Sequence, residues 1–259
     1  ISGQQGTDGQ VLTSTGSGIQ WEDVTSGPTH IEGGTNFTDS ILIGNTSTGT
    51  LSSATDNVGL GDDVFAALTS GRNNVAVGSN SMNADTSGKN NVAVGHDALT
   101  DNTTADNNTA IGKSAMEVNT TGYDNVAVGR NSLDANTSGH SNTAIGESSL
   151  TSNTTGDRNV AIGQNAMSVN TTGSENVAIG RNALDANTDA DSNVAIGDSA
   201  MTASTTANHN TCVGHNAGAS ITVGQGNTCI GADAGDAISG SNGKWNTAVG
   251  FGALSSTTA

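Results

Sequence analysis

The chain has 259 residues, enough for one or two ordinary domains, but 36 glycines, 32% hydrophobic residues and 2% aromatic residues cannot build a large aromatic core. The formal net charge of -17 argues against a nucleic-acid partner, because the 7 basic residues form no stripe that would meet phosphates. No stretch approaches the roughly 18 apolar residues of a membrane span, so we expect no membrane insertion.

Residues 1–39 form an N-terminal connector, because they lack the period that governs the rest of the chain. Within them, "GTDGQVLTSTGSGIQWEDV" (6–24) places glycine-rich turns before a strand that contains a tryptophan. No secretory signal is visible, and the chain opens at Ile1 rather than at a methionine. We therefore expect a processed product or a fragment.

Residues 40–259 repeat with a period of 17. Thirteen glycines mark the copies, the last after a step of 19: Gly44, Gly61, Gly78, Gly95, Gly112, Gly129, Gly146, Gly163, Gly180, Gly197, Gly214, Gly231 and Gly250. Asparagine usually stands four residues before the glycine, and a Val/Thr–Ala–Val/Ile triplet lies between them. Alanine or serine and then leucine or methionine follow at three and four residues after it, and threonine at eight.

This period predicts an all-β fold. Seventeen residues are too few for the known helical repeats, and Val, Ile and Thr beside Gly and Asn are typical of strands and turns. We expect a parallel β-solenoid or β-roll of about 13 coils, in which each coil pairs with the next and like side chains stack about 4.8 Å apart. The chain ends within a coil.

The invariant positions have architectural explanations. Glycine ends each strand where φ is positive or where two backbones pass closely, and threonine supplies turn hydrogen bonds. Asparagine at the same place on each coil can pass amide hydrogen bonds along the stack. The asparagines expected to do so are Asn74, Asn91, Asn108, Asn125, Asn142, Asn159 and Asn176.

The triplet is apolar on both faces of its strand, which predicts an oligomer. A coil of 17 residues offers about five apolar side chains, too few to offset the ordering of that coil alone. One face lines the coil, and the other is expected to meet another copy of the chain, most simply in an elongated homotrimer about the rod axis. The residues assigned to these trimer and core rows are Val126, Ala127, Val128, Val160, Ala161, Ile162, Val177, Ala178 and Ile179.

The position just after the glycine varies from coil to coil and is expected to face solvent. It is also where a row that contacts a receptor could lie. Its members include His96, Lys113, Arg130, Glu147, Gln164 and Arg181.

Cys212 and Cys229 both replace the central alanine of the triplet, 17 residues apart, so they are expected to stack on adjacent coils. Buried free thiols are favoured, although the spacing permits a disulfide. The acidic stretches 61–63 and 185–193 lack a calcium-binding pattern, and we expect no metal and no cofactor. No nucleophile elbow or phosphate-binding loop is present, so an enzyme is not expected.

The unit N-V-A-I-G-x-x-A-L resembles the repeats of the YadA-like heads of trimeric autotransporter adhesins, although their coils are commonly shorter and lack the "NTTG" arm. Longer repeats such as "NTAIGKSAMEVNTTG" (108–122) resemble those of bacteriophage tail fibres, as does the 6–24 segment. The resemblance implies a left-handed roll, a homotrimer and a shaft that carries or forms a host-recognition surface.

The leading hypothesis is therefore a segment of a phage tail fibre, located in the virion. Its partners would be its own copies, other tail proteins and a glycan or protein receptor on the host. The alternative is the head of a trimeric adhesin on a bacterial surface. Two further hypotheses are ice binding by the threonine row from Thr69 to Thr205, and cleavage of host polysaccharide, for which no acidic pair stands apart from the repeat.

Overall fold

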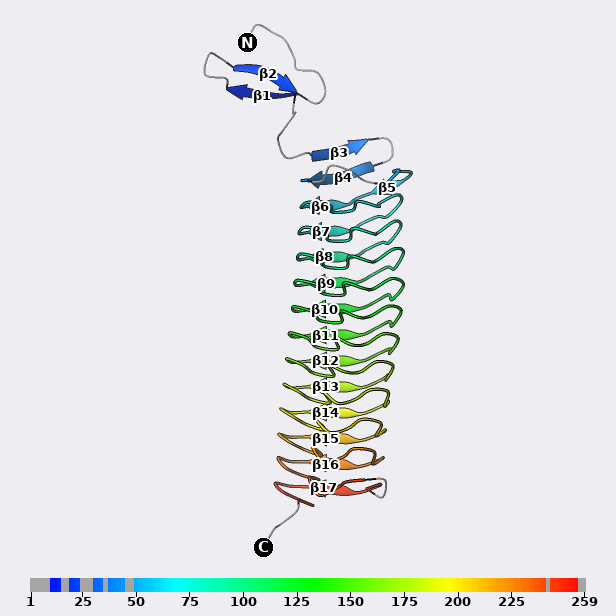
Figure 1. Cartoon of the computed structure of the whole chain (residues 1–259), viewed down its shortest axis with the longest axis vertical. Helices are drawn as coiled ribbons and strands as arrows, with labels where there is room; N and C mark the ends of the chain where they lie inside the picture. Colours follow the sequence, from blue (N-terminus) through cyan, green and yellow to red (C-terminus); the bar gives the residue numbers. More distant parts are fainter. Residues whose placement is uncertain are drawn as a thin grey trace.

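The structure, a computed structural model, describes residues 10–14, 19–23, 30–34, 37–44, 49–240 and 243–255. All regular structure within these ranges is β-strand. Successive coils of the chain stack along the long axis with their strands in one column (Figure 1). The predicted parallel β-solenoid with coils of 17 residues is confirmed.

The N-terminal strands are antiparallel. β1 (Gln10–Ser14) pairs with β2 (Ile19–Asp23) in a sheet of two strands. β3 (His30–Gly34) pairs with β4 (Phe37–Ile43), the first strand of the solenoid. β3 therefore covers the N-terminal edge of the long sheet, which would otherwise expose unpaired backbone groups. The boundary expected after residue 39 lies within β4.

The long sheet runs from β3 through β4 to β17, with the two-residue β5 paired beside β4. The remaining strands are β5 (Ala54–Thr55), β6 (Val58–Leu60), β7 (Val75–Val77), β8 (Val92–Val94), β9 (Thr109–Ile111), β10 (Val126–Val128), β11 (Thr143–Ile145), β12 (Val160–Ile162), β13 (Val177–Ile179), β14 (Val194–Ile196), β15 (Thr211–Val213), β16 (Thr228–Ile230) and β17 (Thr247–Val249).

Equivalent residues of neighbouring coils lie side by side. Ala127 pairs with Ala144, and the register holds through the longer step between Thr228 and Thr247, so the two additional residues lie outside the strands. Backbone hydrogen bonds join the coils, as from the Val126 N–H to the carbonyl of Asn142 at 2.8 Å. At about 4.8 Å per step, the twelve steps from β4 to β17 span about 60 Å.

The interior of the coil is narrow and is filled by small side chains opposite larger ones. The central residue of the strand, usually alanine, is buried, and so is the leucine or methionine four residues after the glycine in the coils before the last one, as for Ala127 and Leu133. These large residues have positive φ, for example 53° at Leu133 and 53° at Met116. This conformation is costly for a residue with a side chain, and burial of that side chain together with a backbone hydrogen bond to the next coil offsets the cost.

Both reasons expected for the repeated glycine are confirmed. Gly163 has a φ of +132°, and a Cβ there would lie 2.5 Å from the carbonyl oxygen of Gly180 on the next coil. The same pattern recurs along the stack. Any side chain at this position would therefore meet backbone that cannot move without shifting a coil.

Cys212 and Cys229 face each other on adjacent strands as buried free thiols, as predicted. Their coils carry glycine, at Gly218 and Gly235, where most of the others carry leucine or methionine. A Cβ at these glycines would lie 2.5 Å from the sulfur of Cys212 and 2.2 Å from that of Cys229. The two thiols therefore occupy space that a leucine or methionine side chain fills elsewhere, and the interior stays packed.

Candidate functional site

The first asparagine row, which lies four residues before the glycines, is buried and fully bonded, so its role is structural. Asn142 donates from Nδ2 to Oδ1 of Asn125 at 3.2 Å and to the carbonyl of Gly156 at 2.8 Å. Its own Oδ1 accepts the backbone N–H of Asn159 at 2.9 Å. In the row of Asn74, Asn91, Asn108, Asn125, Asn142, Asn159 and Asn176, each backbone N–H donates to the Oδ1 of the preceding coil. The expected bonds between side-chain amides are present at Asn74, Asn142, Asn159 and Asn176.

A second buried asparagine row, seven residues after the glycines, was not predicted. Each amide donates to the Oδ1 of the preceding coil, as from Asn136 to Asn119 at 2.7 Å. The row begins at Asp85 and continues through Asn102, Asn119, Asn136, Asn153, Asn170 and Asn187. The signal was present in the recurrent Asn-Thr pair, but an asparagine before a threonine suggests a turn at the surface rather than a buried ladder.

The threonine row, eight residues after the glycines, uses its hydroxyls to join the coils. Oγ1 of Thr86 donates to the carbonyl of Thr103 at 2.8 Å, and Thr137 donates to Thr154 at 3.0 Å in the same way. Ice binding by this row would need hydroxyls presented outward on a flat strand face. The observed geometry instead assigns these hydroxyls to the stack.

The outer strip consists of the residues three and one before each glycine on β6 to β17, and it faces away from the coil. Its members are half-buried or exposed in the single chain, whereas the central residue between them is buried. Val58 is 45% exposed, Leu60 50% and Ile111 40%. The strand rows predicted from the sequence therefore divide: Ala127, Ala161 and Ala178 line the interior, and Val126, Val128, Val160, Ile162, Val177 and Ile179 belong to the outer strip.

The post-glycine row consists of the residues that directly follow the glycines, and it faces solvent over most of its length. Glu147 is half-buried, and the other predicted members His96, Lys113, Arg130, Gln164 and Arg181 are exposed. Ion pairs join neighbouring coils, between Arg130 and Glu147 and between Arg181 and Asp198 at 2.8 Å. Hydrogen bonding to the Arg181 guanidinium holds the pKa of Asp198 below its usual range.

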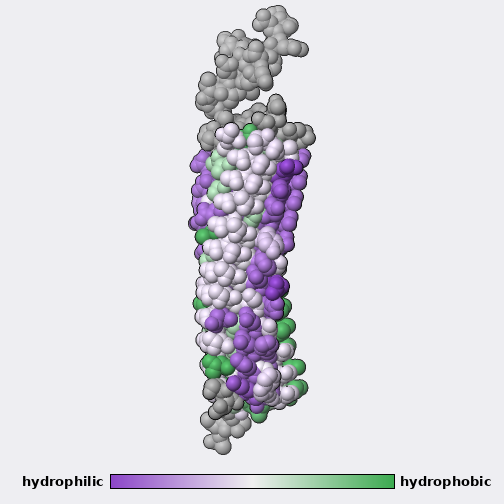
Figure 2. Space-filling model, turned by 90° about the vertical axis from the view of Figure 1, so that its right-hand side faces the viewer, coloured by the Kyte–Doolittle hydropathy of each residue, from purple (hydrophilic) through white to green (hydrophobic). Residues whose placement is uncertain are grey.

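Figure 2 shows one face of the rod, coloured by hydropathy. Strongly hydrophilic side chains gather in a column along the rod, paler residues cover much of the rest, and hydrophobic side chains lie mainly at the edges of the view.

An acidic hollow of about 490 Å³ lies on the rod surface, lined by Arg158, Thr172, Ser174, Glu175, Asp189, Asp191, Ser192 and His209.

The described residues contain no group of three or more His, Cys, Asp or Glu side chains placed to hold a metal ion. Within the same part of the chain, no helix is long and apolar enough to cross a membrane. No family model, curated protein or solved structure matches the chain.

Proposed function

We propose that this chain is a rod-forming segment of a bacteriophage tail fibre, which assembles as a homotrimer and presents its surface to a host cell. The observation that carries the proposal is the outer strip. It is a continuous band of Val, Ile, Leu and Thr side chains along one side of a chain with a net charge of -17. A parallel sheet is normally covered on both faces, and here the coil covers only one.

The size of the outer strip fits an interface. Residues i and i+2 of a strand lie about 7 Å apart, so the strip is about 10 Å wide and about 60 Å long, or on the order of 600 Å². The largest apolar patch on a typical monomeric protein is about 300–600 Å², so the strip is at the upper end of that range. A standard interface buries about 800 Å² on each partner, and one strip approaches that value.

A second copy of the same chain is the partner best matched to the strip. In-register strands place like residues about every 4.8 Å on every copy, so two strips match along their whole length. The strip contains no Lys, Arg, Asp or Glu, and contact there does not bring together the acidic side chains that give each chain a net charge of -17. Three copies, rather than two, follow from the resemblance of the repeats to trimeric adhesin heads.

Immunogold labelling tests whether the rod is part of a phage particle or of a bacterial surface. Gold-labelled antibodies raised against residues 40–259 should decorate the tail of the source phage particle in electron micrographs. Label on the surface of a bacterial cell would favour the adhesin head in place of the tail fibre. Label on neither would contradict both assignments.

A further inference from the structure

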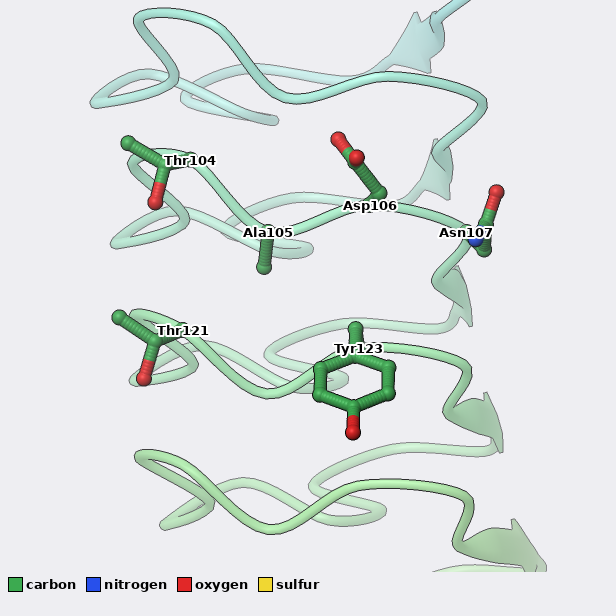
Figure 3. A pocket seen from close by; sticks show the side chains of 6 residues that line it. All are labelled: Thr104, Ala105, Asp106, Asn107, Thr121 and Tyr123. Carbon is green, nitrogen blue, oxygen red and sulfur yellow. The ribbon is translucent and has the colours of Figure 1, made fainter.

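A hollow of about 240 Å³ opens beside β9 and β10, in the N-terminal half of the stack (Figure 1). Figure 3 shows that its residues come from two successive coils, on the segment that runs from a turn to the corner where the chain enters a strand. The lining residues are Thr104, Ala105, Asp106, Asn107, Thr121 and Tyr123. The volume is below the roughly 300–1,000 Å³ of sites for drug-sized ligands and suits a ligand of one ring.

Tyr123, the single tyrosine of the chain, forms an aromatic wall of the hollow. Its ring packs against that of His140, with the centroids 4.7 Å apart and the planes 30° from parallel. Tyr123 is nevertheless 45% exposed, and Figure 3 shows its ring face on. His140 thus supports the ring while a broad apolar surface stays open beside polar groups.

The polar groups around the ring are held in place by the repeat. Oδ1 of Asp106 accepts the backbone N–H of Lys89 at 2.7 Å. Asn107 donates from Nδ2 to Asp124 at 3.0 Å and accepts from Asn90 at 3.1 Å. Within the described part of the chain, these bonds fix the carboxylate and the amide and leave one carboxylate oxygen and one amide hydrogen free for a ligand.

The hydroxyls of the hollow are not used by the stack. The neighbouring Thr103 and Thr120 donate to carbonyls of the next coil, at 3.3 and 2.9 Å. Among the residues that the structure describes, the hydroxyls of Thr104, Thr121 and Tyr123 make no such bond. The hollow thus combines an open aromatic face with three free hydroxyls, a carboxylate and an amide.

We propose that this hollow binds one uncharged pyranose ring of a surface polysaccharide; this assignment rests on the proposed function in host recognition. The C–H face of a pyranose packs on an aromatic ring, and its rim hydroxyls pair with carboxylate, amide and hydroxyl groups. Asp106, Asp124 and the net charge of -17 disfavour anionic sugars. A trimer would carry three such hollows, so weak single sites would bind a polymer jointly.

An internal duplication supplies a natural comparison. Residues 116–139 match residues 167–190 at a shift of 51, so Ser174 stands at the position of Tyr123 and Thr172 at that of Thr121. The acidic hollow includes Thr172 and Ser174 at these equivalent positions, extends onto the following coil and has no tyrosine ring. Thr172→Ala is accordingly the matched control for Thr121→Ala.

The experiment uses the single tyrosine as a reporter. The full chain, labelled with 3-fluorotyrosine, should give one fluorine resonance, which is followed during titration with the methyl glycosides of glucose, galactose, mannose and N-acetylglucosamine, and with N-acetylneuraminic acid. At least one neutral glycoside should shift the resonance saturably at millimolar concentration, and the anionic sugar should bind at least about tenfold more weakly. Thr121→Ala should weaken neutral binding at least about fivefold, and Thr172→Ala should leave it unchanged.

Three results would overturn the proposal: no saturable shift with any neutral glycoside up to about 100 mM, equal binding of the anionic sugar, or equal effects of the two threonine substitutions. The hollow lies within one chain, so the titration reports on it whether or not the chain is a trimer. Sedimentation of the same sample tests the assembly separately.

Discussion

Asn102 donates a hydrogen bond of 2.8 Å from Nδ2 to Oδ1 of Asp85, and this contact begins the second asparagine row. The equivalent position on the coil before Asp85 is Leu68, which offers no donor. Oδ2 of Asp85 is buried and has no hydrogen-bond partner among the residues that the structure describes. Burial raises the pKa of Asp85 to about 7 and nearby Asp106 adds to the shift, while the hydrogen bonds from Asn102 and the Gly88 N–H oppose it.

Asp85 should make the rod less stable as the pH rises. Its folded pKa lies above the ordinary value of 3.8, so the folded state holds the proton more tightly. The free energy of unfolding should therefore fall between pH 3.8 and about 7 and level off above that. Asp85→Asn should remove this fall and raise stability at pH 8 by on the order of 2–4 kcal/mol, because its Nδ2 can donate to the carbonyl three residues on.

Denaturant unfolding at fixed chain concentration, at pH 4 and pH 8, measures the effect. Asp101→Asn, at an exposed position, is the control and should change neither value. An Asp85→Asn variant with the same pH dependence as the parent chain would contradict the assignment.

The first asparagine row should be more important for stability than exposed polar residues. Asn142→Ala removes hydrogen bonds to Asn125 and Gly156 and leaves the N–H of Asn159 without its acceptor. We expect a loss of on the order of 3 kcal/mol in the free energy of unfolding, because buried groups would stay unpaired. Gln164→Ala is the control, because Gln164 is exposed and belongs to neither asparagine row. It should lower the free energy of unfolding by less than about 0.5 kcal/mol. Similar losses in both variants would refute the role given to the row.

The repeated glycine should be required for close stacking as well as for its φ. Gly163→Ala would place a Cβ 2.5 Å from the carbonyl oxygen of Gly180, whereas a Cβ at Gly250 meets nothing within 4 Å among the described residues. Both have a φ that disfavours a side chain, +132° and +120°, so their difference isolates the contact between coils. Thermal unfolding should show Gly163→Ala to be the more destabilising by about 2 kcal/mol or more. Equal effects would leave the backbone conformation as the sole reason for glycine.

Cys212 and Gly218 should be coupled through the space that they share. Gly218→Leu alone would drive a side chain against the sulfur, since even a Cβ lies 2.5 Å from it. Cys212→Ala alone would leave a void. The double variant restores the Ala and Leu pair of other coils and should recover about 1–3 kcal/mol relative to the sum of the two single changes. Additive losses in a double-mutant cycle would show that the two positions pack independently.

The period of 17 was sufficient to predict the parallel β-solenoid, because in that fold residues 17 apart lie side by side on adjacent coils and repeat the same residue type. The glycines and the first asparagine row followed from the same reasoning. The Cys212 and Cys229 contact also did, because both occupy the centre of a triplet.

Other features depend on geometry that the period does not contain. The positive φ of Leu133 and Met116 is contrary to the preference of residues with side chains and arises only because neighbouring coils supply the core and the hydrogen bonds. The burial of Asn136 and its neighbours could not be separated from ordinary turn chemistry. The hollow at Tyr123 combines residues of two coils, and the sequence alone does not show that they line one space.

The outer strip should tolerate no charge if it is an interface between copies. Val160→Lys and Ile162→Lys each place an ammonium group in the strip, and burial of an unpaired charge there would weaken assembly. Gln164→Lys adds the same charge two residues further on, at an exposed position of the post-glycine row, and should leave assembly unchanged. If all three variants assemble as the parent does, the strip is not the contact surface.

Sedimentation equilibrium of the parent chain tests the central claim most directly. The trimer predicts a mass of three times 25.5 kDa that persists on dilution to low micromolar concentration. A folded chain that sediments at 25.5 kDa, with its β-structure intact by circular dichroism, would contradict the proposed assembly.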